Sequence, residues 1–126
     1  MQIKLTILGE LASKANSRQK VTLKGKPAFI KSKKALNFAK SALLQIPTAA
    51  KQMIDCDVCF TAHIYYASRR PDLDESLIMD LLQAKIVKGV VVRKGVYIND
   101  RQIKEKHIYW GLDKDNPRVE IVVSVL

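Results

Sequence analysis

The longest alternating segment of the sequence covers residues 56–66 and constrains the fold more than any other. Its even-numbered residues are apolar or weakly polar (Cys, Val, Phe, Ala, Ile, Tyr), whereas its odd-numbered residues are mostly polar. Successive side chains of a β-strand point to opposite faces, so this pattern predicts a long strand with one buried face. A strand of this length needs neighbouring strands, and we therefore expect a sheet around it.

The rest of the chain predicts a mixed architecture without repeats. Its 126 residues suffice for one hydrophobic core, so we expect a single domain, 1–126. We predict an α+β fold in which a mixed β-sheet packs against two main helices. The expected elements are strands at 2–9, 103–112 and 118–126, hairpins at 21–30 and 86–98, a helix at 32–46 and a helix from 72 or 74 to about 84.

The charge of the chain is large and unevenly distributed. Lys and Arg number 22 against 12 Asp and Glu, which gives a net charge of +10. Residues 1–50 carry +9 of this, because they contain ten basic residues and one acid. Such a basic surface favours a polyanionic partner, although lysines that merely solvate a surface are the alternative interpretation. No segment is long and apolar enough for a membrane helix, so we expect a soluble, cytoplasmic protein.

A pair of carboxylates follows the long strand. Asp72 and Asp74 are separated by one residue, so in an extended segment both side chains project to the same side. Mg²⁺ is commonly held by one or two carboxylates together with water and phosphate oxygens. Arg69 and Arg70 come just before the pair and can bind the phosphates of a nucleic acid. The alternative is structural, because either aspartate can cap the next helix.

These motifs together resemble one protein family. Residues 68–74 (Ser-Arg-Arg-Pro-Asp-Leu-Asp), an apolar helix and then residues 99–102 (Asn-Asp-Arg-Gln) are similar to the RusA-type Holliday junction resolvases. Residues 13–18 resemble the Asn-containing N-terminal loop of that family, and residues 31–35 resemble the start of its first helix. The resemblance therefore covers nearly the whole chain.

The resemblance implies a function. A RusA-like protein is a homodimeric, Mg²⁺-dependent endodeoxyribonuclease of DNA recombination and repair, encoded by a bacterium or a phage, which makes paired symmetric nicks in four-way DNA junctions. Mn²⁺ is able to substitute, and neither an organic cofactor nor a membrane is involved. By motif match, Asp72, Asp74 and Asp100 are the catalytic, metal-binding residues. The residues expected to bind DNA are Lys14, Asn16, Arg18, Lys31, Lys33, Lys34, Arg69, Arg70 and Arg101.

The sequence departs from the family in two places. The family commonly has a functional lysine one helical turn after Asp-Leu-Asp, whereas this chain has none there; Lys85, Lys14 or a residue of the other subunit are the alternatives. The Val-rich segment 86–98 is also longer than the usual link to the third carboxylate, which suggests a DNA-facing or dimer-forming hairpin. A non-catalytic or less selective branched-DNA-binding protein is the alternative function.

The remaining reactive residues predict little. Cys56 and Cys59 have the spacing of a zinc or redox motif, but strand alternation would place their sulfurs on opposite faces. His63 and His107 stand alone in strand patterns, and we expect neither to be a general base. We expect Tyr109 and Trp110 to pack in the core rather than to stack on unpaired bases.

Overall fold

The computed structural model describes residues 1–13, 18–69, 71 and 73–126. Its strands and helices follow the expected order closely. In chain order they are β1 (Gln2–Leu8), β2 (Arg18–Leu23), β3 (Lys26–Lys31), α1 (Lys33–Gln45), the 3₁₀ turn η2 (Thr48–Ala50), β4 (Val58–Tyr66), α2 (Glu75–Leu82), β5 (Lys85–Val87), β6 (Val90–Arg93), the 3₁₀ turn η3 (Asp100–Gln102), β7 (Ile103–Leu112) and β8 (Arg118–Val125).

A four-stranded mixed sheet forms the centre of the molecule. Its strand order is β1-β8-β4-β7, with β8 antiparallel to both β1 and β4. Strands β4 and β7 are parallel, and they pair in a register that joins Cys59 to Glu105 and Tyr66 to Leu112. A parallel pair needs a long crossover connection, which α2 and the β5–β6 hairpin provide here. The predicted α+β fold with a mixed sheet and two helices is confirmed.

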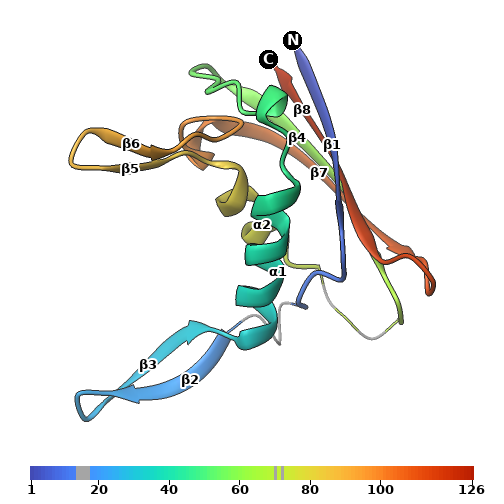
Figure 1. Cartoon of the computed structure of the whole chain (residues 1–126). Coiled ribbons are helices and arrows are strands. Elements are labelled where there is room, and N and C mark those ends of the chain that lie inside the picture. Colours follow the sequence, from blue (N-terminus) through green and yellow to red (C-terminus); the bar gives the residue numbers. More distant parts are fainter. Residues whose placement is uncertain (14–17, 70, 72) are drawn as a thin grey trace.

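The two helices cover one face of this sheet (Figure 1). The alternation of β4 places Phe60, Ala62 and Ile64 on that face, where they are fully buried. Helix α1 begins as predicted at Ser32, whose side chain accepts a hydrogen bond from the N–H of Ala35 (3.2 Å). The long strand begins two residues later than predicted, and Cys56 is exposed rather than buried.

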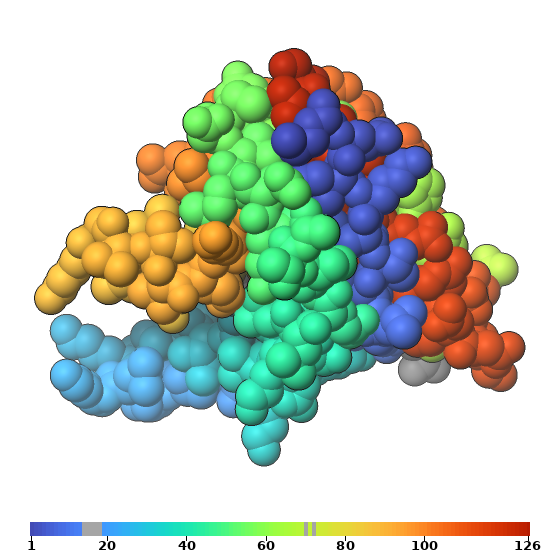
Figure 2. Space-filling view, turned by 45° about the horizontal axis from the view of Figure 1, so that its top comes forward, coloured from blue at the N-terminus to red at the C-terminus, as the bar shows by residue number. Residues whose placement is uncertain are grey.

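Two hairpins project from this core. The β2–β3 hairpin turns at Lys24-Gly25, and the β5–β6 hairpin turns at Lys88-Gly89; all four residues have positive φ. Two-residue turns of this kind match the twist of antiparallel strands, and glycine adopts them without strain. Both hairpins extend to the same side of the molecule (Figure 1, Figure 2).

The edge strand β7 corrects one prediction. Tyr109 and Trp110 were expected in the core, but the structure leaves them 49% and 38% exposed. Tyr109 stacks on His63 across the sheet, with ring centroids 4.6 Å apart. No residue of β7 is fully buried, so its exposure shows little alternation. In the described part of the chain, neither helix is long and apolar enough to cross a membrane.

Candidate functional site

The loop between β4 and α2 carries part of the predicted site. Arg69 is exposed at its start. Four predicted residues, Lys14, Asn16, Arg70 and Asp72, lie outside the described residues, and for Arg18 only the backbone is described, as the first residue of β2.

Asp74 is the residue at which α2 begins. It occupies the N-cap position, as predicted, but its carboxylate makes no capping hydrogen bond to the helix backbone within the described chain. Instead the Ser76 hydroxyl donates to Oδ1 of Asp74 at 2.6 Å. The residue is only 7% exposed. Asp74 is therefore a nearly buried carboxylate held by a short hydrogen bond at the start of α2.

Asp100 lies in the turn η3, which precedes β7. Asn99 caps this turn, since its Oδ1 accepts a hydrogen bond from the N–H of Arg101 (2.9 Å). Gln102 completes the capping box, because its Oε1 accepts from the N–H of Asn99 (2.8 Å). The N–H of Asp100 donates to Oε1 of Gln83 (3.1 Å). The Asn and Gln of this motif thus build the turn and orient Asp100.

Asp74 and Asp100 lie near opposite ends of α2. Asp74 precedes α2, whereas Asp100 contacts Gln83, which follows the helix. A helix of eight residues is about 12 Å long. Oxygen ligands of one Mg²⁺ lie no more than about 4.2 Å apart, because each lies about 2.1 Å from the ion. The oxygen atoms of both aspartates suit Mg²⁺ chemically, but positions near opposite ends of α2 do not by themselves form one metal site.

A different carboxylate lies near Asp100, and the sequence did not point to it. Asp80, in α2, accepts hydrogen bonds from Gln83 Nε2 at Oδ1 (2.9 Å) and from Lys31 Nζ at Oδ2 (3.2 Å). Burial raises the pKa of Tyr97, and the charges of Asp100 and Asp80 raise it further. Its hydroxyl stays protonated and donates to the backbone oxygen of Met79 (2.5 Å). No motif marks Asp80, because it is one polar residue on an amphipathic helix.

A pocket of about 300 Å³ opens next to Asp80, where both hairpins join the core. Three basic side chains line it: Lys31 at the end of β3, Lys85 in β5 and Arg93 in β6. Nε of Arg93 is buried and has no hydrogen-bond partner among the described residues. A buried N–H without an acceptor costs about 1–3 kcal/mol, and an oxyanion that reached Nε of Arg93 would offset this cost.

The other predicted DNA-binding residues are dispersed. Lys33 and Arg101 are exposed, whereas Lys34 pairs with Glu10 (3.0 Å). Burial alone would raise the pKa of Glu10. The hydrogen bond from the N–H of Ala67 and the charge and hydrogen bond of Lys34 have the larger opposite effect, so the pKa is lowered. Of the alternatives for the missing lysine, Lys85 lines the pocket described above.

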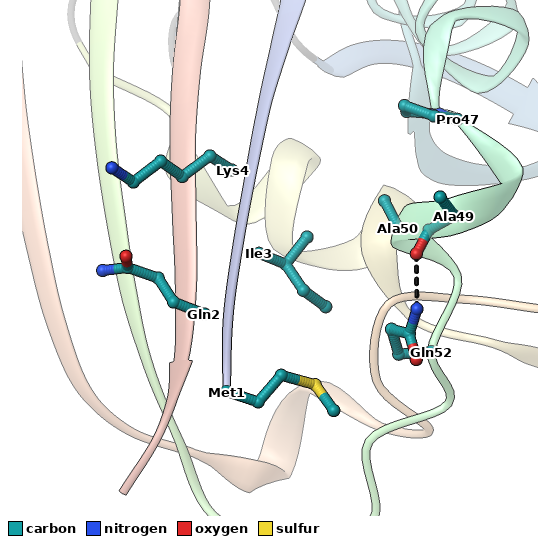
Figure 3. Close-up of a pocket in the computed structure, with 8 residues that line it drawn as sticks. All are labelled: Met1, Gln2, Ile3, Lys4, Pro47, Ala49, Ala50 and Gln52. Atoms are coloured by element: carbon teal, nitrogen blue, oxygen red, sulfur yellow. Dashed lines mark hydrogen bonds between the residues drawn. The ribbon is translucent and has the colours of Figure 1, made fainter.

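A second pocket has no reactive group. It lies between the start of β1 and η2, and its volume is about 330 Å³. Figure 3 shows Ile3 pointing towards Ala50, while the side chain of Lys4 lies on the other side of β1. The side-chain amide of Gln52 donates a hydrogen bond to the backbone oxygen of Ala49 (2.5 Å). This pocket is an apolar hollow rather than a candidate active site.

Potential metal ligands do meet elsewhere in the described chain. Ligand atoms of Cys59, Glu105 and His107 lie within 4.8 Å of one another, on the sheet face opposite the helices. The sequence predicted no site there, since Cys59 lies more than 40 positions before Glu105 and His107. No protein-family model and no curated protein matches this chain.

Proposed function

We propose that this chain binds branched DNA, four-way junctions above all, between its two hairpins and cleaves it as a Mg²⁺-dependent endodeoxyribonuclease. One observation supports this most strongly: the hairpins carry basic residues and no acid. They extend to the same side, so their charges form one surface for a polyanion (Figure 2). The basic residues are Arg18, Lys20, Lys24, Lys26 and Lys31 in β2–β3, and Lys85, Lys88 and Arg93 in β5–β6.

The pocket between the hairpins would hold a phosphate of the DNA backbone. Lys85 and Arg93 can donate to phosphate oxygens, and Arg93 Nε has no acceptor among the described residues. Lys31 is already paired with Asp80 (3.2 Å), which orients its ammonium group at the same wall. Gln83 connects Asp80 to the backbone of Asp100. Asp80 thus lines this phosphate site, and Gln83 links it to Asp100.

The proposed nuclease requires Mg²⁺. When bound, Mg²⁺ would polarise the scissile phosphate and activate a water molecule. Asp72, Asp74 and Asp100 remain the proposed ligands from the resemblance to RusA-type resolvases. Of these, Asp74 lies at the start of α2 and Asp100 lies near its end, next to Gln83.

The proposal includes a homodimer. A four-way junction has approximate two-fold symmetry, and two opposed strands must be cut, so a symmetric pair of active sites matches it. Large apolar side chains are also exposed on the hairpins, and a second copy would cover some of them. They are Leu23, Phe29 and Ile30 in the first hairpin, and Ile86, Val87, Val90, Val91 and Val92 in the second.

The deciding experiment compares cleavage of three substrates. The protein is incubated in Mg²⁺ with a synthetic four-way junction, a Y-fork and a linear duplex of the same sequence. We expect symmetric paired nicks in the junction alone, and loss of cleavage in Asp100→Asn and Asp74→Asn. Asp115→Asn, in the exposed β7–β8 turn, is the control and should cleave normally. Equal cleavage of all three substrates would contradict junction selectivity.

The hairpins are tested separately by binding. Lys20, Lys24 and Lys26 are replaced together by Gln, and a control carries the same change at Lys4, Lys40 and Lys114, which lie on other elements. We expect the hairpin variant to bind the junction more weakly and with a smaller salt dependence. Its slope of log K against log salt should fall by about 0.9 for each phosphate that the variant no longer neutralises. Equal effects of the two triple variants would show that charge alone, not the hairpin, binds DNA.

The separation of Asp74 from Asp100 favours a second candidate function. A protein that binds branched DNA without cutting it would keep the hairpins and need no shared metal ion. Junction binding without cleavage at every Mg²⁺ or Mn²⁺ concentration would support this function and exclude the nuclease. If Asp80→Asn abolishes cleavage and Asp74→Asn does not, the protein is still a nuclease, but Asp80 rather than Asp74 is its catalytic carboxylate.

A further inference from the structure

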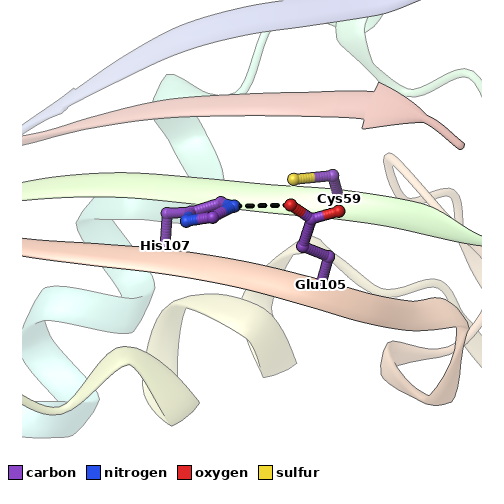
Figure 4. Close-up of side chains that lie close together, drawn as sticks. All are labelled: Cys59, Glu105 and His107. Carbon is purple, nitrogen blue, oxygen red and sulfur yellow. Dashed lines mark hydrogen bonds and ion pairs between the residues drawn. The ribbon is translucent and has the colours of Figure 1, made fainter.

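The sheet face opposite the helices carries a cluster of side chains that the proposed nuclease does not use. Cys59 lies in β4, and Glu105 and His107 lie in β7 (Figure 4). One potential ligand atom from each of them lies within 4.8 Å of the other two. His107 Nε2 and a carboxylate oxygen of Glu105 are 2.8 Å apart. Sulfur, nitrogen and oxygen donors therefore converge at one point of this face.

The sheet itself holds these three positions in place. In the parallel pairing of β4 and β7, Cys59 lies opposite Glu105, and Thr61 lies opposite His107. Residues two apart in a strand point to the same face, so Glu105 and His107 share the face of Cys59. Figure 4 shows all three side chains projecting from neighbouring strands towards one another. A ligand would bind here with little rearrangement of the backbone.

We propose that Cys59, Glu105 and His107 form a binding site for Zn²⁺ or a similar divalent transition metal. Zn²⁺ binds thiolate, imidazole and carboxylate ligands at about 2.3, 2.0–2.1 and 2.0–2.2 Å. Ligand atoms of a tetrahedral site therefore lie about 3.4–3.6 Å apart, which rotation of the exposed Glu105 and His107 side chains can achieve. The contact between His107 and Glu105 would be replaced by bonds to the metal.

The three donor atoms determine which metal ion binds and the net charge of the metal site. A thiolate and an imidazole favour Zn²⁺ or Co²⁺ over Mg²⁺, which prefers oxygen ligands. The ion would displace the thiol proton of Cys59, so binding should weaken as the pH falls. With a thiolate, a carboxylate and a neutral imidazole, the site is electrically neutral, and water completes the fourth position. This site is independent of the Mg²⁺ requirement of the proposed nuclease.

The metal would also strengthen the sheet edge. Strand β7 is at the edge of the sheet, where it pairs with β4. A metal bound by one residue of β4 and two of β7 would cross-link this pair. Because the ion binds the folded chain, its binding free energy adds to stability, so the melting temperature should rise with metal concentration.

Cobalt titration tests the site directly, because Co²⁺ bound to a thiolate shows a charge-transfer absorption that other ligands do not give. The full chain is first treated with a chelator, and folding of each variant is checked by thermal unfolding in the chelator. We expect one Co²⁺ per chain, the charge-transfer band, and displacement of Co²⁺ by Zn²⁺ but not by Mg²⁺. Cys59→Ser should lose the band, and His107→Gln should bind at least about tenfold more weakly.

Two matched controls make the test specific. Cys56→Ser removes the other thiol, which is exposed and outside the cluster, and His63→Gln removes the other histidine, which stacks on Tyr109. Both variants should keep the band and the affinity of the parent chain. The proposal is overturned if the parent chain shows no band in excess Co²⁺, if Cys56→Ser loses it, or if Cys59→Ser and His107→Gln bind as well as the parent.

Discussion

The central sheet and the two hairpins bury their apolar residues to very different extents. Phe60 in β4 is fully buried, whereas Phe29 in β3 is 72% exposed. Strands β1, β4 and β8 alternate between buried residues and half-buried or exposed ones, but β5 and β6 have no buried residue. An isolated two-stranded hairpin is marginally stable in water, so each hairpin depends on contacts where it joins the core.

The difference indicates that the sheet and helices stabilise the fold, whereas the hairpins provide the proposed binding surface. Burial of apolar surface holds the sheet and helices together. The hairpins contribute little to that core, and they carry eight basic residues and no acid. Substitutions in the sheet should therefore change folding, whereas substitutions in the hairpins should change the interaction with DNA.

Phe60→Ala should have the largest effect on stability. Its ring is fully buried in the core between the sheet and the helices, so truncation reduces apolar burial and leaves a cavity. We expect the free energy of unfolding to fall by about 3–5 kcal/mol, as measured by urea denaturation. A decrease below about 1 kcal/mol would mean that the sheet does not form the stable centre of the molecule.

Gly95→Ala should have an intermediate effect and affect both regions. A Cβ atom at Gly95 would lie about 2.5 Å from the backbone of Leu82 and Gln83, where the chain leaving β6 crosses the end of α2. Overpacking of this kind costs about 1–3 kcal/mol in the free energy of unfolding. The shift should also move Asp100 and reduce junction cleavage. Unchanged stability and cleavage would contradict the close approach at Gly95.

Phe29→Ala should have the smallest effect, although it removes the same side chain as Phe60→Ala. We expect a change in the free energy of unfolding within about 0.5 kcal/mol, because Phe29 is exposed. The measurement is repeated at several protein concentrations. A larger decrease that grows on dilution would instead assign Phe29 to the interface of the proposed dimer.

Local patterns predicted most of the elements. Alternation identified β1 and β4, strands were also expected where β7 and β8 lie, and helical spacing with Ser32 and Pro47 defined α1. Both hairpins were expected near their observed turns. These signals are local, because a strand or helix that faces a core needs apolar residues at its own period. The exposure of Tyr109 and Trp110 was wrongly predicted, because the sequence does not tell an edge strand from a central one.

Contacts between distant segments could not be predicted from the same patterns. Cys59 meets Glu105 and His107 only because β4 and β7 pair in parallel in one particular register. Asp80 and Asp100 come near each other only because Gln83 bridges the end of α2 and η3. Contacts of this kind depend on how the core packs, and the hydrophobic periodicity along the chain does not predict them.

The two hairpins differ in reach, although both turn on the dipeptide Lys-Gly. The six residues of β2 span about 20 Å, whereas the three and four residues of β5 and β6 span about 10–13 Å. A major groove is about 12 Å wide and admits a two-stranded ribbon. The longer β2–β3 hairpin could therefore span a DNA groove that the shorter β5–β6 hairpin would only enter. Adding one residue to each of β2 and β3, or removing one from each, would change the length of this hairpin by about 3.3 Å and leave the core unchanged.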